Sequence, residues 1–169
     1  MKVTSAQANK LLKKLQASYE DVCAKENKSY RYVAAVTEDA DSVKPAYDFA
    51  KTQKRKEDIC AQIRRLKHSI NVFNTTTVIP EFGITVDEAL VYLPQLRAVV
   101  QKYDEMRSYL PKERISGYSS STIIEYKYTN YDVLEAEEKY NEAASKLTAL
   151  QLALDVVNST VEFEIENII

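Results

Sequence analysis

Residues that interrupt helices are scarce in this chain: its 169 residues include only two glycines and four prolines. Both residue types mark turns, so their scarcity favours long, uninterrupted helices over a barrel or sandwich of many short strands. Hydrophobic residues make up 45% of the chain and charged residues 28%, which is typical of an ordered globular protein rather than a disordered one. We therefore expect a mainly α-helical protein.

Four segments carry apolar residues at alternating steps of three and four, the spacing of a single helix face. Capping boxes open the first and third segments, as Thr4-x-x-Gln7 and Thr85-x-x-Glu88. We expect the second helix to begin within residues 42–45 and the fourth to be capped by Thr129 or Asn130. The expected stripes are Ala8, Leu12, Leu15, Tyr19 and Val22; Phe49, Thr52, Lys56, Ile59, Ile63, Leu66, Ile70 and Phe73; Val86, Ala89, Leu93, Leu96, Val100, Tyr103 and Leu110; and Val133, Ala136, Tyr140, Ala143, Leu147, Leu150, Leu154 and Val157.

The second stripe is a heptad pattern long enough to shape the whole molecule. At ~1.5 Å per residue its helix would reach ~45 Å, which is too long for a compact globule of this size. Heptad stripes favour packing against other long helices. The sequence thus predicts four long helices in an elongated antiparallel bundle or coiled coil, forming one domain over residues 1–169, with a bend near residues 90–94 caused by Pro94.

Short β-strands are expected between the helices. Residues 30–36 and 122–128 are rich in tyrosine and β-branched residues, residues 76–79 look extended, and apolar residues alternate with glutamate over residues 160–165.

An internal repeat is indicated by the second and fourth helices. At a constant offset of 84 residues, Ile63 falls on Leu147 and the rest of the two stripes stays in register. Both helices then end alike, in Phe73-Asn-Thr-Thr and Val157-Asn-Ser-Thr. This indicates a duplication with units at about 4–79 and 85–165. Because asparagine tolerates the left-handed conformation, Asn74 and Asn158 are predicted helix C-caps.

The sequence offers no pattern for catalysis, and we expect neither a metal nor a cofactor. The lone histidine, His68, lies off the stripe of its helix and should face solvent, while Cys23 and Cys60 lack metal-ligand spacing and are expected to be reduced core residues. Glycines occur only at positions 83 and 117, without the surroundings of a phosphate-binding loop. An enzymatic role stays open only for a carboxylate or tyrosine site, such as one formed between subunits.

The strongest local signal is basic. It lies on the second helix and includes Lys54, Arg55, Arg64, Arg65 and Lys67, whereas the fourth helix is acidic over residues 135–142. The two faces can complement each other between neighbouring helices or subunits. The leading hypothesis is a non-enzymatic helical protein that self-associates as a homo-oligomer or scaffolds a protein partner. The alternative is nucleic-acid or polyanion binding through the basic residues.

The location expected from the sequence is the cytoplasm. The first residues do not form a secretion signal, and no apolar run approaches the ~18 residues of a membrane span, so no membrane partner is expected.

Several short segments resemble a small bacterial family of unknown function labelled septicolysin-like. They are Ile70-Asn-Val-Phe-Asn-Thr75, Ile84-Thr-Val-Asp-Glu-Ala-Leu90, the passage from Ile123 to Leu134, and Asn158-Ser-Thr-Val-Glu-Phe-Glu-Ile165. The resemblance implies coiled-coil helical hairpins and a bacterial origin, but no activity or site. The tyrosine-rich segment Tyr30–Val36 and Pro94 depart from what we associate with the family.

Overall fold

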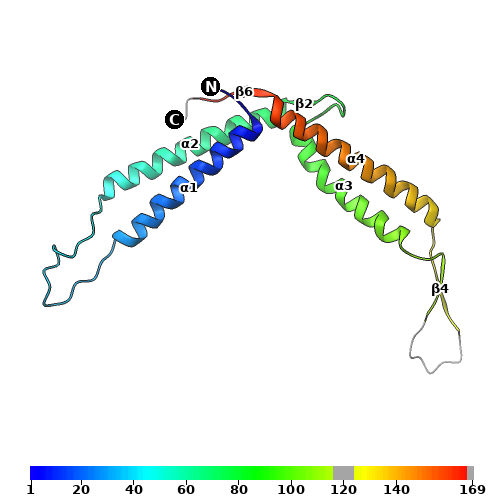
Figure 1. Cartoon of the computed structure of the whole chain (residues 1–169), viewed down its shortest axis with the longest axis horizontal. Helices are drawn as coiled ribbons and strands as arrows, with labels where there is room; N and C mark the ends of the chain where they lie inside the picture. Colours follow the sequence, from blue (N-terminus) through cyan, green and yellow to red (C-terminus); the bar gives the residue numbers. More distant parts are fainter. Residues whose placement is uncertain (116–123, 167–169) are drawn as a thin grey trace. The chain divides into compact units, whose positions relative to one another are not determined.

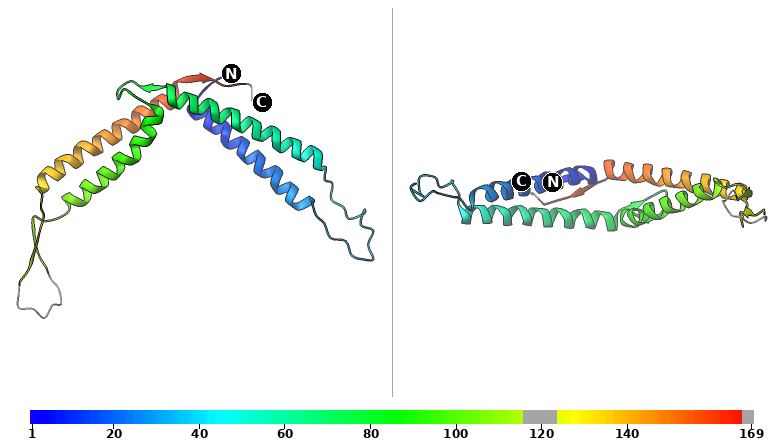
Figure 2. Two further views of the ribbon diagram at one scale, coloured as in Figure 1. Left: turned by 180° about the vertical axis from the view of Figure 1, so that it is seen from behind. Right: turned by 90° about the horizontal axis from the view of Figure 1, so that it is seen from below.

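A computed structural model describes residues 1–115 and 124–166 of the chain, and these form four helices and six short strands. The helices are α1 (Ser5–Ser29), α2 (Phe49–Thr76), α3 (Val86–Arg107) and α4 (Val133–Thr160). In all views α1 lies alongside α2, and α3 lies alongside α4 (Figures 1 and 2). The prediction of a mainly α-helical fold with short strands is confirmed.

The chain divides into two compact units. Unit 1 contains Met1–Thr76 and the residues from Asn158 onward, and unit 2 contains Thr77–Val157. Unit 1 is therefore the α1–α2 hairpin completed by residues from the far end of the chain, whereas unit 2 is a continuous segment built around the α3–α4 hairpin.

The strands form three antiparallel pairs, all of them short. In unit 1, β1 (Lys2–Thr4) pairs with β6 (Glu162–Glu164), with Val3 opposite Phe163. In unit 2, β2 (Val78–Ile79) pairs with β3 (Ile84–Thr85), and the turn between them contains Gly83 at φ 65°, a backbone conformation that glycine adopts without strain. Also in unit 2, β4 (Lys112–Arg114) pairs with β5 (Tyr126–Tyr128).

Both predicted capping boxes are present. The Thr4 hydroxyl accepts a hydrogen bond from the Gln7 backbone N–H, and the Gln7 side chain accepts one from the Thr4 backbone N–H. Thr85 and Glu88 make the same reciprocal pair at the start of α3. Each box satisfies two backbone donors that a helix start leaves without an intrahelical partner, so the sequence locates the starts of α1 and α3.

The predicted stripes supply most of the buried residues. In unit 1, Val3, Ala8, Leu66, Ile70 and Ile165 form one core cluster. Against it lies Phe163, whose ring stacks on Phe73 with centroids 4.7 Å apart. In unit 2 the buried stripe residues are Val86, Ala89, Leu93, Leu96, Ala136, Leu150, Leu154 and Val157. Two stripe positions are instead exposed: Phe49 at the start of α2, and Leu110, which lies beyond the end of α3.

Helices α2 and α4 correspond closely. Both are 28 residues long, and Val133 and Thr160 lie 84 positions after Phe49 and Thr76. This is the offset at which the sequence stripes align. Leu66 and Leu150, which are equivalent at this offset, are both completely buried.

The strand predicted over residues 30–36 is wrong. These residues have neither helix nor strand structure, and Val33 and Val36 are 92% and 106% exposed. A strand needs a hydrogen-bonding neighbour and a face to bury, and no described segment supplies either here. β propensity alone does not form a strand.

Some helix boundaries also differ from the prediction. Helix α2 begins after Asp48, whose carboxylate accepts a hydrogen bond from the Lys51 N–H at 2.9 Å, and not within residues 42–45. Asp132, rather than Thr129 or Asn130, binds the Leu134 N–H at the start of α4. Aspartate is a strong N-cap, and in both cases the one nearest the helix takes this role.

Asn74 and Asn158 are not C-caps. Helices α2 and α4 continue to Thr76 and Thr160, and no described non-glycine residue has a positive φ. At the end of α2, beyond Asn74, the Thr75 and Thr76 hydroxyls donate to carbonyl oxygens one turn back, a pattern seen for threonines inside helices. Because both helices continue two residues past these asparagines, the following strands are shorter than predicted and start at Val78 and Glu162.

Of the strand predicted over residues 122–128, residues 126–128 form β5, and residues 122–123 lie outside the described part of the chain.

Candidate functional site

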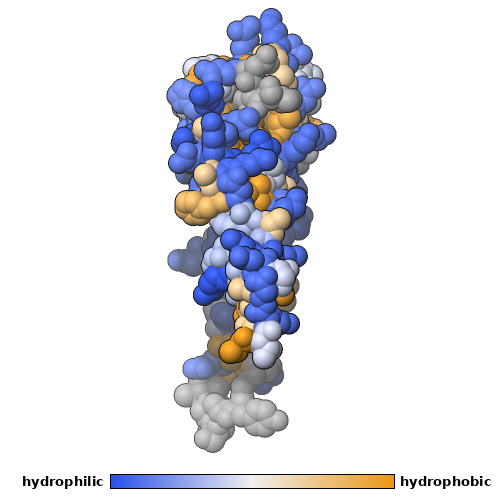
Figure 3. Space-filling model, turned by 90° about the vertical axis from the view of Figure 1, so that its left-hand side faces the viewer, coloured by the Kyte–Doolittle hydropathy of each residue, from blue (hydrophilic) through white to orange (hydrophobic). Residues whose placement is uncertain are grey.

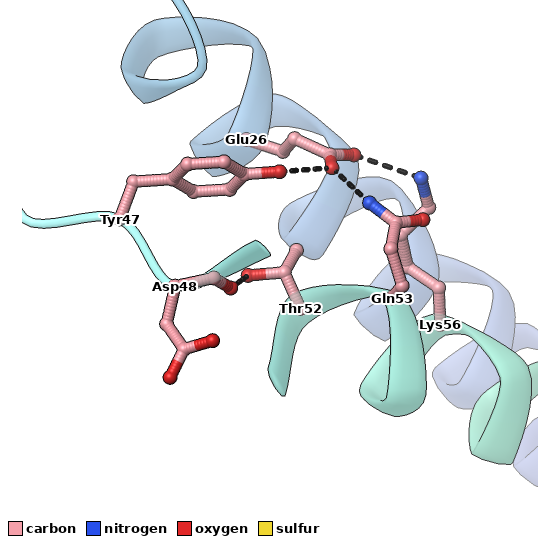
Figure 4. A network of polar contacts seen from close by, with 6 residues as sticks. All are labelled: Glu26, Tyr47, Asp48, Thr52, Gln53 and Lys56. Carbon is pink, nitrogen blue, oxygen red and sulfur yellow. Dashed lines mark hydrogen bonds and ion pairs between the residues drawn. The ribbon is translucent and has the colours of Figure 1, made fainter. Parts of the chain in front are cut away.

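Among the described residues of unit 1, a polar cluster surrounds the Glu26 carboxylate near the end of α1 (Figure 4). Its Oε1 accepts hydrogen bonds from the Tyr47 hydroxyl, at 2.8 Å, and from the Gln53 amide. Its Oε2 pairs with Lys56 Nζ at 2.8 Å. The Glu26 and Lys56 side chains are only 13% and 22% exposed, so this ion pair is partly protected from water. Residues of α1, α2 and the segment before α2 thus meet at one carboxylate.

The electrostatics of this cluster follow from its hydrogen bonds. The pKa of Glu26 is lowered, chiefly by the hydrogen bond from Lys56 and next by that from Tyr47. The pKa of Lys56 is raised, first by the hydrogen bond to Glu26. Burial, followed by the hydrogen bond to Glu26, raises the pKa of Tyr47. The three groups therefore hold each other in the charge states of the ion pair, an arrangement that fastens α1 to α2.

Next to this cluster lie the two cysteines. Cys23 and Cys60 are free and half-buried on α1 and α2. The pKa of Tyr19 is raised, first by a side-chain hydrogen bond with Cys23 and then by the electrostatic effect of Cys23 and Cys60. Within the described residues, no group of three histidine, cysteine, aspartate or glutamate side chains could hold a metal ion.

The structure does not gather the five predicted basic residues into one surface. Arg65 forms an exposed ion pair with Glu166 at 3.6 Å, and Arg55 lines a groove between α1 and α2. Lys54, Arg64 and Lys67 are exposed. Arg64 and Lys67 lie about one turn apart and so can act together, whereas Lys54 is nearly three turns away from Arg64. His68 is exposed, as its place off the stripe predicts.

The groove lined by Arg55 has a volume of about 290 Å³ and is also lined by Lys14. Its apolar lining comes from Leu11, Leu15 and Ile165. The groove thus combines two positive side chains with apolar ones.

In unit 2 the helices are joined by cation–π contacts, whereas in unit 1 they are joined through the Glu26 carboxylate. The Arg107 guanidinium lies 3.9 Å from the centre of the Tyr140 ring, and Lys146 Nζ lies 5.2 Å from that of Tyr92. These contacts join α3 to α4 at two levels. The Tyr131 hydroxyl, just before α4, donates to the Met106 carbonyl oxygen of α3 at 2.8 Å.

A second cavity, of about 360 Å³, lies where α3 meets the β4–β5 pair. Its walls include Tyr109, Tyr128 and Tyr131, with Lys102 and Lys127 among its polar residues. Lys102 is paired with Glu105 at 3.0 Å, so part of the positive charge at this cavity is already neutralised.

Exposed apolar side chains occur near the start of α3 and near the end of α4. Leu90 and Val91 of α3 are 47% and 59% exposed, and Leu152 and Val156 of α4 are 62% and 59% exposed. We call these four residues the α3–α4 apolar patch. On the face of the molecule seen in Figure 3, by contrast, hydrophobic residues form small areas within a mainly hydrophilic surface.

The acidic residues of α4 lie on its exposed side. Glu135, Glu137, Glu138 and Glu142 are all exposed, and Glu142 pairs with Lys139 at 2.8 Å. No helix among the described residues is long and apolar enough to cross a membrane.

The sequence did not reveal the Glu26 cluster or the pairing of Arg107 with Tyr140. Their members lie far apart along the chain, and the only local signals, single charged or aromatic residues beside a stripe, occur at many other positions.

Comparison with known proteins identifies a fold but not a family. The structure is similar to the crystal structure of a functionally unknown conserved protein from Corynebacterium diphtheriae. The TM-score is 0.59 at 20% sequence identity, over 97% of this chain and 100% of that one. No family model matches this chain, and neither does any curated protein. A likeness at this level of identity extends to the fold alone.

Proposed function

We propose that the protein acts by self-association, with the α3–α4 apolar patch as the contact between copies. The observation that carries this proposal is the second half of α4, which is apolar around most of its circumference. Leu150, Leu154 and Val157 are buried, while Leu152 and Val156, one turn apart, are 62% and 59% exposed. A helix that carries apolar residues beyond the face it buries normally packs against a further partner.

A second copy of this chain suits the patch. Leu90 and Val91, near the start of α3, are also exposed, so both helices of the hairpin offer apolar residues to a partner. Two copies related by a twofold axis would bring the same patch of each together, which is the commonest arrangement in homo-oligomers. Covering these exposed apolar residues with a second copy removes them from water, which favours association.

The test is the mass of the full-length protein in solution, measured by size-exclusion chromatography with light scattering over a range of concentrations. We expect a mass that rises above the 19.3 kDa of one chain as the concentration increases. The double variant Leu152→Lys, Val156→Lys should remain a monomer, because each new charge would be buried at the contact.

The matched control is Leu134→Lys, on the same helix and 70% exposed but near its other end. It should assemble like the unmodified protein. A monomer at every concentration, or equal dissociation of the Leu134 variant, would contradict the proposal. Far-ultraviolet circular dichroism shows whether each variant keeps its helices.

Polyanion binding by α2 is the alternative function. Arg64 and Lys67, exposed and about one turn apart, favour it, while the ion pairs of Arg65 and Lys56 reduce the charge available on the same helix. Salt-dependent binding of single-stranded oligonucleotides that is lost in the variant Arg64→Glu, Lys67→Glu would support this alternative.

A further inference from the structure

The β4–β5 pair is a two-stranded ribbon whose two faces differ in chemistry. Lys112 lies opposite Tyr128, Arg114 opposite Tyr126, and Glu113 opposite Lys127. Because directly opposed residues of an antiparallel pair point to the same side, and neighbours along a strand point to opposite sides, the first two pairs share one face. We call Lys112, Arg114, Tyr126 and Tyr128 the ribbon face.

The side chains of the ribbon face are exposed and close together. Tyr126 and Tyr128 are 43% and 63% exposed, and their ring centres are 6.4 Å apart. Lys112 Nζ lies 4.2 Å from the centre of the Tyr126 ring and 5.5 Å from that of Tyr128. The contact holds the lysine beside both rings.

The positive charge of this face is uncompensated within the described residues. Neither Lys112 nor Arg114 forms an ion pair there, and Glu113 lies on the other face, opposite Lys127. Two cations and two aromatic rings therefore occur together without a carboxylate among them.

We propose that the ribbon face binds single-stranded nucleic acid. Proteins that bind single strands combine cations that contact the phosphates with aromatic rings on which the bases stack. Lys112 and Arg114 are two residues apart on one strand, hence about 6.6 Å apart, a spacing close to one step of an extended nucleotide chain. The exposed sides of Tyr126 and Tyr128 supply two neighbouring stacking positions.

A lipid surface suits this face less well. Each tyrosine of β5 adjoins charged residues along the strand, in the order Glu125, Tyr126, Lys127, Tyr128, and Glu113 separates the two cations of β4. Binding to a membrane surface strengthens with the apolar area that is buried, and the ribbon face offers two tyrosine rings but no aliphatic side chain. A nucleic-acid strand needs only the rings and the two cations.

The experiment measures binding of the full-length protein to fluorescein-labelled oligothymidylate and oligouridylate of about 12 nucleotides, a length within the usual site size. Fluorescence anisotropy is recorded over a series of salt concentrations. We expect binding at low salt that weakens as salt increases. The variant Lys112→Gln, Arg114→Gln should reduce the slope of log affinity against log salt by about 1.4, the value for two phosphate contacts to a single strand.

The variant Tyr126→Ala, Tyr128→Ala should weaken binding by about tenfold or more and leave the salt slope unchanged, because stacking does not release counterions. Lys127→Gln is the matched control, since it removes one cation of the same strand from the other face. Its affinity should stay within about twofold of that of the unmodified protein.

Four outcomes would overturn the proposal. The first is the absence of binding at low salt. The second is an equal loss on substituting Lys127. The third is a greater loss from Arg64→Glu, Lys67→Glu than from either ribbon variant, which would assign binding to α2. The fourth is tyrosine-dependent binding to phosphatidylserine vesicles without binding to either oligonucleotide. Circular dichroism of each variant verifies that the helices are intact.

Discussion

The two hairpins share their caps and their buried positions, but different contacts join the two helices of each hairpin. Each begins with a threonine capping box and buries apolar residues at matching positions of its second helix. In unit 1 the Cα atoms of α1 and α2 approach within 8 Å at many points, and a partly buried carboxylate joins the helices. In unit 2 the Cα atoms of α3 and α4 seldom come so close, and large rings beneath cations fill the wider spacing.

Comparing the two hairpins shows which features both of them share and which differ between them. Caps and buried stripe positions recur in both hairpins, since they form the helices and the core. The inter-helix contacts close to the connecting segments differ between the hairpins. The connection between α1 and α2 is irregular over residues 30–48, whereas the connection between α3 and α4 contains the β4–β5 ribbon. Specialisation of the two hairpins is therefore concentrated at these connections.

The largest effect expected concerns the shared core. Leu66→Ala and Leu150→Ala, at equivalent and completely buried positions, should each lower the free energy of unfolding by about 3 kcal/mol, within the usual range for a buried leucine. Urea unfolding followed by circular dichroism measures both. Leu134→Ala, at an exposed position of α4 outside the α3–α4 apolar patch, is the control and should change stability by about 0.5 kcal/mol or less. A several-fold difference between Leu66 and Leu150 would show that the cores are not equivalent.

A smaller effect is expected at the caps. Thr4→Ala and Thr85→Ala each remove the side-chain acceptor of a capping box and should cost about 1 kcal/mol. The melting temperature of each variant reports this loss. Thr4→Ser and Thr85→Ser keep the hydroxyl and should recover most of it. If serine and alanine behave alike at either site, the cap there is not what stabilises the helix.

The smallest effect expected is on the pH dependence of stability, and it should differ between the two hairpins. Hydrogen bonds from Lys56 and Lys102 lower the pKa values of Glu26 and Glu105 respectively. A carboxyl whose pKa is lower in the folded state adds stability above its unfolded pKa, about 4.3 for glutamate, and loses it as pH falls through the folded pKa. Glu26→Gln should therefore lower the melting temperature at neutral pH, and the difference from the unmodified protein should shrink steadily below about pH 4.

Glu105→Gln is the comparison in unit 2. The Glu105 side chain is 51% exposed, against 13% for Glu26, so solvent screens its ion pair more and its substitution should matter less. Equal shifts for the two variants at neutral pH would remove the distinction drawn between the hairpins.

Features that depend on neighbouring residues in the chain were predictable. The Thr4 and Thr85 boxes fixed two helix starts, and the stripe from Ile59 to Phe73 identified buried positions, because caps and helix faces are properties of local sequence. The mainly helical fold followed from these patterns and from the scarcity of glycine and proline.

Features that depend on residues far apart in the chain could not be predicted from the sequence. Tyr47 meets Glu26 from 21 positions away, and nothing in either neighbourhood indicates the pairing. The Tyr30–Val36 segment has the composition of a strand but lacks a partner, and Asn74 has the composition of a cap but is followed by threonines that continue the helix. The ribbon face depends on the register of β4 against β5, which the sequence does not reveal.

The pairing of β1 with β6 has a consequence for the order of folding. The amino group of Met1 donates to the Ile165 carbonyl oxygen across a sequence separation of 164 residues, and Ile165 is part of the unit 1 core. During synthesis, unit 2 is complete as soon as residue 157 has emerged, whereas the α1–α2 hairpin must wait, with part of its core uncovered, for residues made afterwards. The first hairpin to be translated is thus the last to be finished, and the slow step of folding should be the closure of this longest loop.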